Sequence, residues 1–136
     1  MNYRAILFLT LTAAPAMADR IELSNSIQPA ETDRYGCAIR PRPEHLTFRS
    51  FRDAWRSVAA DDLYSLRRHQ LALEVGSCDC ETLWPDWSII ADEFEELGFS
   101  APTGTDSLHI AWSEEEYFPI ISDLRDRLRI QCQGSE

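Results

Sequence analysis

The sequence predicts a small, mainly α protein: a bundle of about four helices, stapled by two disulfides, with an extended N-terminal arm. Three observations predict this class. Apolar residues recur at helical spacing in segments bounded by capping residues or by glycine. The chain contains four cysteines, an even number that favours disulfides in an oxidising compartment. An apolar leader precedes a polar stretch that has no periodicity.

Residues 1–18 have the layout of a cleaved signal peptide. A basic start that ends at Arg4 is followed by a short apolar run and by Ala16-Met17-Ala18, an A-x-A cleavage pattern. The apolar run has roughly a dozen residues, against the about 20 needed to span a bilayer, so we expect no stable membrane insertion. Neither Asn2 nor Asn25 begins a glycosylation sequon. We therefore expect secretion across the inner membrane into a bacterial periplasm.

Residues 19–36 are expected to form a flexible arm, and residues 37–136 a single disulfide-stapled helical domain. The arm is polar and lacks periodicity. In the segment that follows, Pro41 and Pro43 lie two residues apart, which excludes a helix and favours extended backbone tethered by Cys37.

Two helices are predicted between Phe48 and Val75. Thr47 is the expected cap of the first, which runs to Ala60. Its core-facing residues share one face at helical spacing: Phe48, Phe51, Trp55, Val58 and Ala59. Asp61 or Asp62 is the expected cap of the second helix, which ends at Gly76. Since this second helix has apolar side chains on two sides, we expect it to lie between two neighbours.

The third predicted helix covers residues 87–97. Asp86 is its expected cap and Gly98 its stop, and apolar residues recur along one face between them. The stretch Leu108-His109-Ile110-Ala111-Trp112 is interpreted as a short strand or an extended segment.

A fourth helix is predicted from Ser113 to about Gln131. Ser113 and Glu116 have the spacing of a capping box. Pro119 falls inside the span, so the helix is expected either to kink there or to begin there.

Cys78 and Cys80 are separated by one residue, and their partners decide whether they are a structural or a chemical centre. We expect each to reach one of the two distant cysteines. The pairing is then Cys37 with Cys78 and Cys80 with Cys132, or the crossed version. Each bridge would contribute about 4 kcal/mol to stability in the chain-entropy account.

Two alternatives use this cysteine pair chemically. A Cys78–Cys80 bridge would close a strained, reducible ring suited to thiol-disulfide exchange. Against this, Asp79 and Glu81 raise the pKa of a neighbouring thiol, and the C-x-x-C spacing is absent. A metal-handling protein would use the pair as thiolate ligands, but the spacing is unusual for zinc and the histidines are scattered. We expect no metal and no cofactor.

The residue inventory excludes several enzyme classes. The chain has no lysine, which excludes a Schiff base and a P-loop lysine. It has only five glycines, none spaced as in a phosphate-binding loop, and it lacks the G-x-S-x-G, S-x-x-K and H-E-x-x-H patterns. We therefore assign no catalytic residue and expect a protein that is not an enzyme.

Charge is divided unevenly along the chain, whose net charge is −10. The residues from His69 to Leu124 include no lysine or arginine, whereas those from Arg34 to Arg68 are net basic. The larger acidic part would repel phosphates, so we expect no nucleic-acid binding. Either the two parts pair with each other or a cationic partner docks on the acidic one.

A partner-binding surface is predicted at the third helix. Three glutamates crowd the negative end of its dipole: Glu93, Glu95 and Glu96. We expect three arginines of the first helix to pack beside them and neutralise them: Arg49, Arg52 and Arg56. The alternative is a docking surface for a basic protein, to which nearby aromatic and aliphatic side chains would contribute. The candidate partner-binding residues are Trp84, Ile89, Asp92, Glu93 and Glu96.

Together these observations predict a small exported, non-catalytic module of the cell envelope. It would bind a protein partner of basic character, as an accessory subunit or an inhibitor-like module. The two alternatives are a thiol-disulfide redox protein centred on Cys78 and Cys80, and a metal-handling protein.

Overall fold

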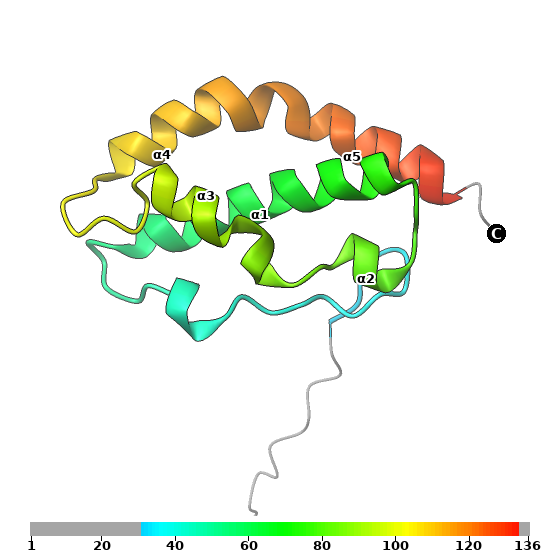
Figure 1. Cartoon of the computed structure of the whole chain (residues 1–136), viewed down its shortest axis with the longest axis horizontal. Coiled ribbons are helices and arrows are strands. Elements are labelled where there is room, and N and C mark those ends of the chain that lie inside the picture. The colour runs from blue at the N-terminus through cyan, green and yellow to red at the C-terminus, as the bar shows by residue number, and fades with distance from the viewer. Residues whose placement is uncertain (1–30, 134–136) are drawn as a thin grey trace, which may run out of the picture.

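The computed structural model describes residues 31–133, and this part of the chain is a helical bundle without a β-strand (Figure 1). The mainly α fold class is confirmed. The predicted signal peptide and residues 19–30 of the predicted arm lie outside the described residues. The elements in chain order are η1 (Glu44–Leu46), α1 (Ala54–Val75), α2 (Cys80–Leu83), η2 (Trp87–Ile90), α3 (Ala91–Glu96), α4 (Asp106–Trp112), η3 (Ser113–Tyr117) and α5 (Phe118–Gln133).

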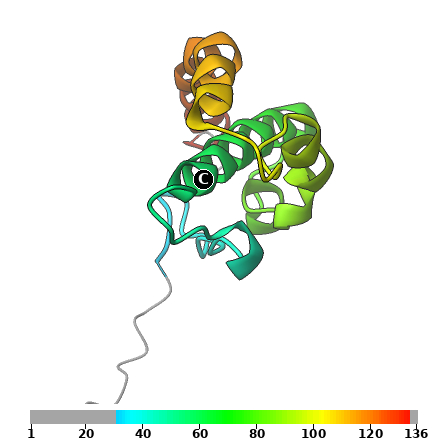
Figure 2. The ribbon, with the colours of Figure 1, turned by 90° about the vertical axis from the view of Figure 1, so that its left-hand side faces the viewer.

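The long helix α1 forms the centre of the molecule. On one side it contacts α4, η3 and α5, which follow one another as a single arched helix (Figure 1). On the other side it contacts the short elements η1, α2 and η2. Figure 2, viewed at right angles, shows α1 between the arch and these short elements. The prediction of a helix packed on two sides is therefore confirmed. Among the described residues no helix is long and apolar enough to cross a membrane.

Helix α1 joins the two predicted helices into one of 22 residues, because the predicted break at Asp61 and Asp62 does not occur. Aspartate suits a helix cap, but it also tolerates an outer helix position when its carboxylate finds a partner. Here Asp61 pairs with Arg42, and Asp62 lies 2.9 Å from Nε2 of His109. The C-terminal end is as predicted: Gly76 has a φ of 72°, in the left-handed region that favours glycine.

The start of α1 was predicted too early, since the helix begins at Ala54 and residues 48–53 form a turn. Thr47 is not a cap; its hydroxyl donates to the Pro43 carbonyl at 3.0 Å. The Ser57 hydroxyl accepts from the Phe48 backbone N–H at 2.8 Å and so holds this turn against the helix. Phe51, in this turn, is fully exposed, and Val58, within α1, is half-exposed, so neither belongs to the core face that was predicted for them.

The third predicted helix is present as η2 followed by α3, which confirms its position within one residue. The Asp86 carboxylate caps it by accepting from the Ser88 N–H at 2.9 Å. Gly98, with a φ of 76°, follows its end. A one-turn helix not predicted from the sequence, α2, precedes it, and Asp79 caps that turn by accepting from Thr82 N–H at 2.8 Å.

The segment interpreted as a strand or extended approach is the helix α4, so that interpretation was wrong. In this helix Trp112 is buried and His109 is partly buried, and their rings stack 6.2 Å apart, whereas Leu108 and Ile110 are exposed. The predicted capping box does not form, because Ser113 lies inside the arch and its hydroxyl donates back to the Ile110 carbonyl. The wide π-helical turn η3 precedes Pro119, whose ring nitrogen has no N–H to donate to the preceding turn.

Residues 31–36, predicted as the end of a flexible arm, belong to the folded domain. Thr32 and Ala38 form an isolated antiparallel bridge around a turn. One carboxylate oxygen of Asp33 accepts from the backbone N–H groups of Tyr35 and Cys37, each at 2.9 Å. The other accepts from the Trp84 indole N–H at 2.7 Å. These bonds move the domain boundary upstream of the predicted Cys37.

The core is filled by side chains from every layer. The largest fully buried ones are Phe99, Leu63, Leu66, Leu83, Ile90, Leu128 and Cys37. Tyr64 of α1 stacks on Trp87 of η2 with ring centroids 3.9 Å apart, and its hydroxyl donates to the Pro85 carbonyl at 2.7 Å. Burial raises the pKa of Tyr64 to about 12, so the hydroxyl remains a donor at physiological pH.

Candidate functional site

The cysteine pair is a structural centre in this fold. Cys37 is bonded to Cys80, and Cys78 to Cys132, which is the crossed version of the two predicted pairings. The first bridge ties the N-terminal segment to α2, and the second ties the end of α5 to the loop after α1. Cys78 and Cys80 therefore do not form the bridge that a redox centre between them requires. A thiolate metal site would need free thiols, whereas these sulfurs are bonded to one another in pairs.

Trp84, the predicted aromatic anchor for a partner, is engaged inside the molecule. Its indole N–H donates to Asp33, and the Arg68 guanidinium lies over its ring with Cζ 3.8 Å from the centroid. The side chain is half-buried and packs against the core. Its contacts thus hold the N-terminal turn against α1.

The other predicted partner-binding residues lie along η2 and α3. Ile89, Asp92 and Glu96 are exposed there. Glu93 points the other way and forms a two-pronged salt bridge with Arg67 of α1, whose Nε donates at 2.7 Å. This pairing, mainly through the hydrogen bonds to Glu93, raises the pKa of Arg67.

The predicted neutralisation of the glutamates by the first helix is wrong. Arg49 pairs with Glu44, and the Arg56 guanidinium is buried against backbone carbonyls of residues 99–104. The turn at residues 48–53 displaces Arg49 from α1. Arg67, about three turns after Arg56 on α1, takes the predicted role for Glu93 alone. Glu95 and Glu96 form no salt bridge with any residue between 31 and 133.

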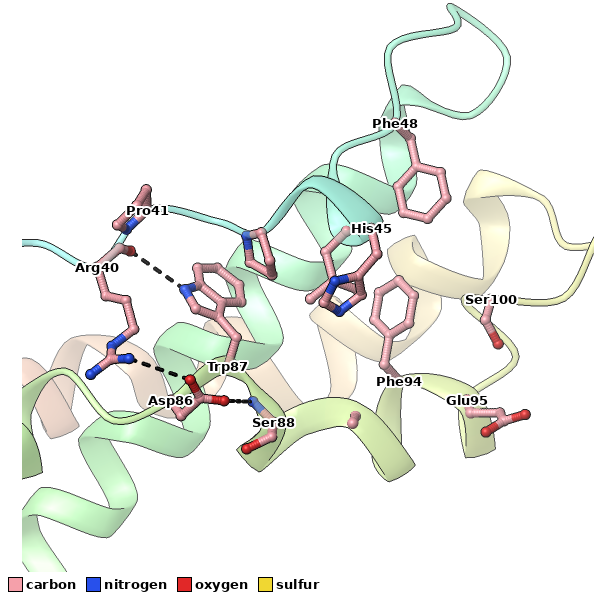
Figure 3. A pocket seen from close by; sticks show the side chains of 13 residues that line it. Arg40, Pro41, His45, Phe48, Asp86, Trp87, Ser88, Phe94, Glu95 and Ser100 are labelled. Atoms are coloured by element: carbon pink, nitrogen blue, oxygen red, sulfur yellow. Dashed lines mark hydrogen bonds and ion pairs between the residues drawn. The ribbon is translucent and has the colours of Figure 1, made fainter.

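A groove of about 660 Å³ runs beside this acidic stretch (Figure 3). One wall is the extended segment that contains both prolines, followed by η1, and the other is η2 with α3. Figure 3 shows Arg40, Asp86 and Trp87 toward one end and Phe94, Glu95 and Ser100 toward the other. The lining residues are Arg40, Pro41, Pro43, His45, Leu46, Phe48, Asp86, Trp87, Ser88, Ala91, Phe94, Glu95 and Ser100.

Two prolines and a few contacts between the walls hold the groove in shape. The two prolines keep the first wall extended, as predicted, and remove two backbone donors from it. Arg40 fastens this wall to the other by donating to the Trp84 carbonyl at 3.2 Å and by pairing with Asp86 at 3.3 Å. The Trp87 indole N–H donates to the Arg40 carbonyl at 3.4 Å. Hydrogen bonds from Ser88 lower the pKa of Asp86, so its carboxylate stays ionised at the rim.

The groove combines an apolar floor with a polar rim. Leu46, Trp87 and Phe94 on the floor belong to the buried core, and Phe48 packs against that core. Asp86, Ser88 and Glu95 form the rim on the side of η2 and α3 and are exposed. A few convergent polar groups on an apolar surface are typical of ligand-binding sites.

Comparison with known protein families, curated proteins and solved structures finds no match to this chain. The geometry of the groove and the charge around it therefore carry the functional argument. None of the predicted residues lines the groove. Ile89, Asp92 and Glu96 are exposed on η2 and α3, whereas Trp84 and Glu93 are engaged in contacts within the chain. Sequence reasoning missed Pro41, Pro43, His45, Phe48 and Phe94 as lining residues. The one available signal was the paired prolines in a chain otherwise rich in helical patterns.

Proposed function

We propose that this protein is an exported, non-catalytic module that holds a segment of another protein in the groove between residues 40–48 and η2–α3. The segment would present apolar side chains to the floor and arginine or lysine side chains to the acidic rim. The observation that carries this proposal is the groove itself, an open apolar trough of about 660 Å³. Its lining includes the carboxylates of Asp86, which pairs with Arg40, and of Glu95.

The floor has the composition of an interface core. Trp87, Phe94 and Phe48 present aromatic surface to the groove. Aromatic residues are enriched where interfaces gain most of their binding energy, and a polar rim that excludes water surrounds such centres. Ile89 on η2 is exposed but does not line the groove, and it would add apolar contact area for a partner that extends past the groove.

The charge beside the groove supports a basic partner. Asp92, Glu95 and Glu96 are exposed on α3, and none of the three forms a salt bridge with residues 31–133. The chain carries a net charge of −10, so its field would attract a cationic segment from a distance and speed association. Rim carboxylates of this kind are expected to affect association rate and salt dependence more than affinity.

Export remains part of this proposal. Two disulfides among the described residues are compatible with an oxidising compartment such as a bacterial periplasm. The predicted signal peptide of residues 1–18 supplies the route. Neither alternative function gains support from the site, because redox exchange and thiolate metal binding both need cysteines that are bonded elsewhere in this fold.

The test is selection of random peptides, displayed in a library, on the immobilised disulfide-bonded protein. We expect enriched peptides to combine apolar residues with arginine or lysine. Ala91→Arg places a long charged side chain in the groove and should abolish binding. Ala111→Arg is the matched control, since Ala111 is also an exposed alanine on a helix but lies on α4, outside the groove. If the peptides bind the Ala91→Arg variant with the same affinity as the parent protein, the groove is not the binding site.

A second pair of variants tests the acidic rim. Glu95→Gln with Glu96→Gln should slow association of an enriched basic peptide and weaken its salt dependence. Glu114→Gln with Glu115→Gln removes the same charge from another exposed helical pair and should change the rate much less. Equal effects of the two double variants would show that only the overall charge matters and would contradict a basic segment seated at this rim.

A further inference from the structure

A second pocket, of about 370 Å³, lies where three parts of the chain meet. The turn after Thr32 contributes Arg34 and Tyr35. Helix α1 contributes Arg68 and His69, and α5 contributes Arg125. This pocket shares no lining residue with the groove described above, and nothing in the proposed function requires it.

Arg68 is held at the pocket by neutral groups. Its Nη1 donates to the Leu83 carbonyl at 3.0 Å, and its guanidinium stacks over the Trp84 ring. It forms no salt bridge with residues 31–133. Burial lowers the pKa of Arg68, which nevertheless stays charged because arginine is not deprotonated in proteins. A guanidinium has five N–H donors, and those on Nε and Nη2 of Arg68 have no acceptor among residues 31–133, so they can bind a ligand.

Arg125 faces the same pocket from α5. Its Nη2 donates to the Tyr117 hydroxyl at 3.2 Å and to the Ser65 hydroxyl at 3.4 Å, both neutral acceptors. Within residues 31–133 Arg125 and Arg34 also lack a salt bridge, whereas Arg127 and Arg129 on the same helix each pair with an aspartate. Three arginines without an acidic partner in this part of the chain therefore meet at one pocket of an acidic protein.

The acidic residues at the pocket are already engaged. Asp33 accepts three hydrogen bonds, from two backbone N–H groups and the Trp84 indole, and Asp126 pairs with Arg129. Burial, and next the charge of Arg68, lower the pKa of His69 to about 4, so this ring is neutral at physiological pH. Its Nδ1 lies 2.6 Å from the Ser65 carbonyl, which can only accept, so Nδ1 carries the proton. Three cations thus face two carboxylates, and the pocket is net positive.

We propose that this pocket binds a small organic molecule with one carboxylate group and an aromatic or apolar body. The carboxylate would accept from Arg68 and Arg125, and the body would lie against Tyr35 and Trp84. Planar guanidinium groups match the geometry of carboxylates and bind them with two parallel hydrogen bonds. The volume equals that of about twelve molecules of liquid water and accommodates a ligand with a single ring.

Because the pocket has only a small net positive charge, it favours a ligand with one negative charge over a ligand with two. A doubly charged phosphate would gain from the arginines but would be repelled by Asp33 and Asp126, which line the same pocket. A carboxylate brings one charge, and its apolar body replaces water at the aromatic rings.

The test is a titration of the disulfide-bonded protein, followed by NMR, with benzoate as the probe. The Trp84 indole N–H reports on the pocket, and the Trp112 indole, which does not line it, is the internal reference. Arg125→Gln should weaken binding about tenfold or more, the loss expected for a charge-assisted hydrogen bond. Arg127→Gln is the matched control on α5, because Arg127 pairs with Asp123 and does not line the pocket.

Neutral benzamide and inorganic phosphate complete the experiment. Shifts of the Trp84 signal with benzoate, and much weaker ones with benzamide, support the proposal. It is overturned if benzoate produces no shift up to about 10 mM, if benzamide or phosphate binds as well as benzoate, or if Arg127→Gln weakens binding as much as Arg125→Gln. Because the peptide selection uses another surface, failure of this titration leaves the proposed groove intact.

Discussion

Replacing Arg56 with alanine should destabilise the whole domain, although arginine is among the residues least often buried. The side chain is 3% exposed. Its guanidinium donates to the Phe99 carbonyl, to the Ala101 carbonyl at 2.7 Å and, more weakly, to the Gly104 carbonyl at 3.5 Å. It also pairs with Asp53 at 3.2 Å and lies over the Trp55 ring. One side chain therefore fastens residues 99–104 to α1.

The magnitude follows from the bonds that alanine cannot replace. A hydrogen bond to a charged group contributes about 1.5–3 kcal/mol, so the two shorter carbonyl contacts together represent about 3–6 kcal/mol. The truncation also leaves the Phe99 carbonyl without this donor, beside a ring that is fully buried. Whole domains are stable by about 5–15 kcal/mol, so this one change should remove a large share of the total. Arg56→Lys keeps the charge but loses the planar set of guanidinium N–H donors, and we expect it to lower the free energy of unfolding by about half as much.

The assay is urea unfolding of the disulfide-bonded protein, followed by far-ultraviolet circular dichroism. The control is Arg52→Ala, because Arg52 is exposed and should change the free energy of unfolding by no more than about 0.5 kcal/mol. A loss below about 1 kcal/mol in Arg56→Ala, with an unchanged denaturant slope, would refute the reasoning. If the alanine variant does not fold, Arg56→Lys still provides the comparison with Arg52→Ala.

Two further predictions concern the disulfides and one buried histidine. Replacing Cys78 and Cys132 together by serine should lower the free energy of unfolding by about 2–5 kcal/mol, measured by urea unfolding. An unchanged free energy of unfolding in this variant would contradict the structural role of the bridge. For His69, the folded-state pKa of about 4 lies below the unfolded value of 6.5, so its stabilising contribution is complete above pH 6.5 and is lost as the pH falls toward 4. The parent protein should therefore lose free energy of unfolding between pH 7 and pH 4.5, and His69→Gln should lose less, by up to about 3 kcal/mol. Equal losses in the two proteins would contradict this assignment.

Local signals in the sequence predicted the helix ends that one or two residues decide. Asp86 caps its helix and Gly76 and Gly98 end theirs, because capping and left-handed backbone depend on the residue at that position. Asp61 and Asp62 carried the same local signal, but no cap forms there. Their carboxylates find Arg42 and His109, which come from distant parts of the chain and leave no mark in the local pattern.

The groove could not be predicted, since its two walls are about forty residues apart in the chain. Arg40 contacts Trp84 and Asp86 across separations of 44 and 46 residues. The same holds for the arginines: sequence shows that Arg56 and Arg67 stand near the acidic half, but only the fold decides that Arg67 meets Glu93 while Arg56 is buried against carbonyls. The composition still placed the acidic, exposed stretch of α3 correctly, because long runs of charge rarely become buried.

The two disulfide loops have a consequence for proteolysis. One loop runs from Cys37 to Cys80 and the other from Cys78 to Cys132, so they overlap at residues 78–80 and together enclose every peptide bond between residues 37 and 132. A protease that cuts once anywhere in this interval leaves both fragments covalently joined. The nicked protein keeps its mass under non-reducing conditions and separates into two pieces only after reduction. A chain linked in this way can be cleaved at an exposed turn, such as residues 48–53, without releasing either wall of its groove.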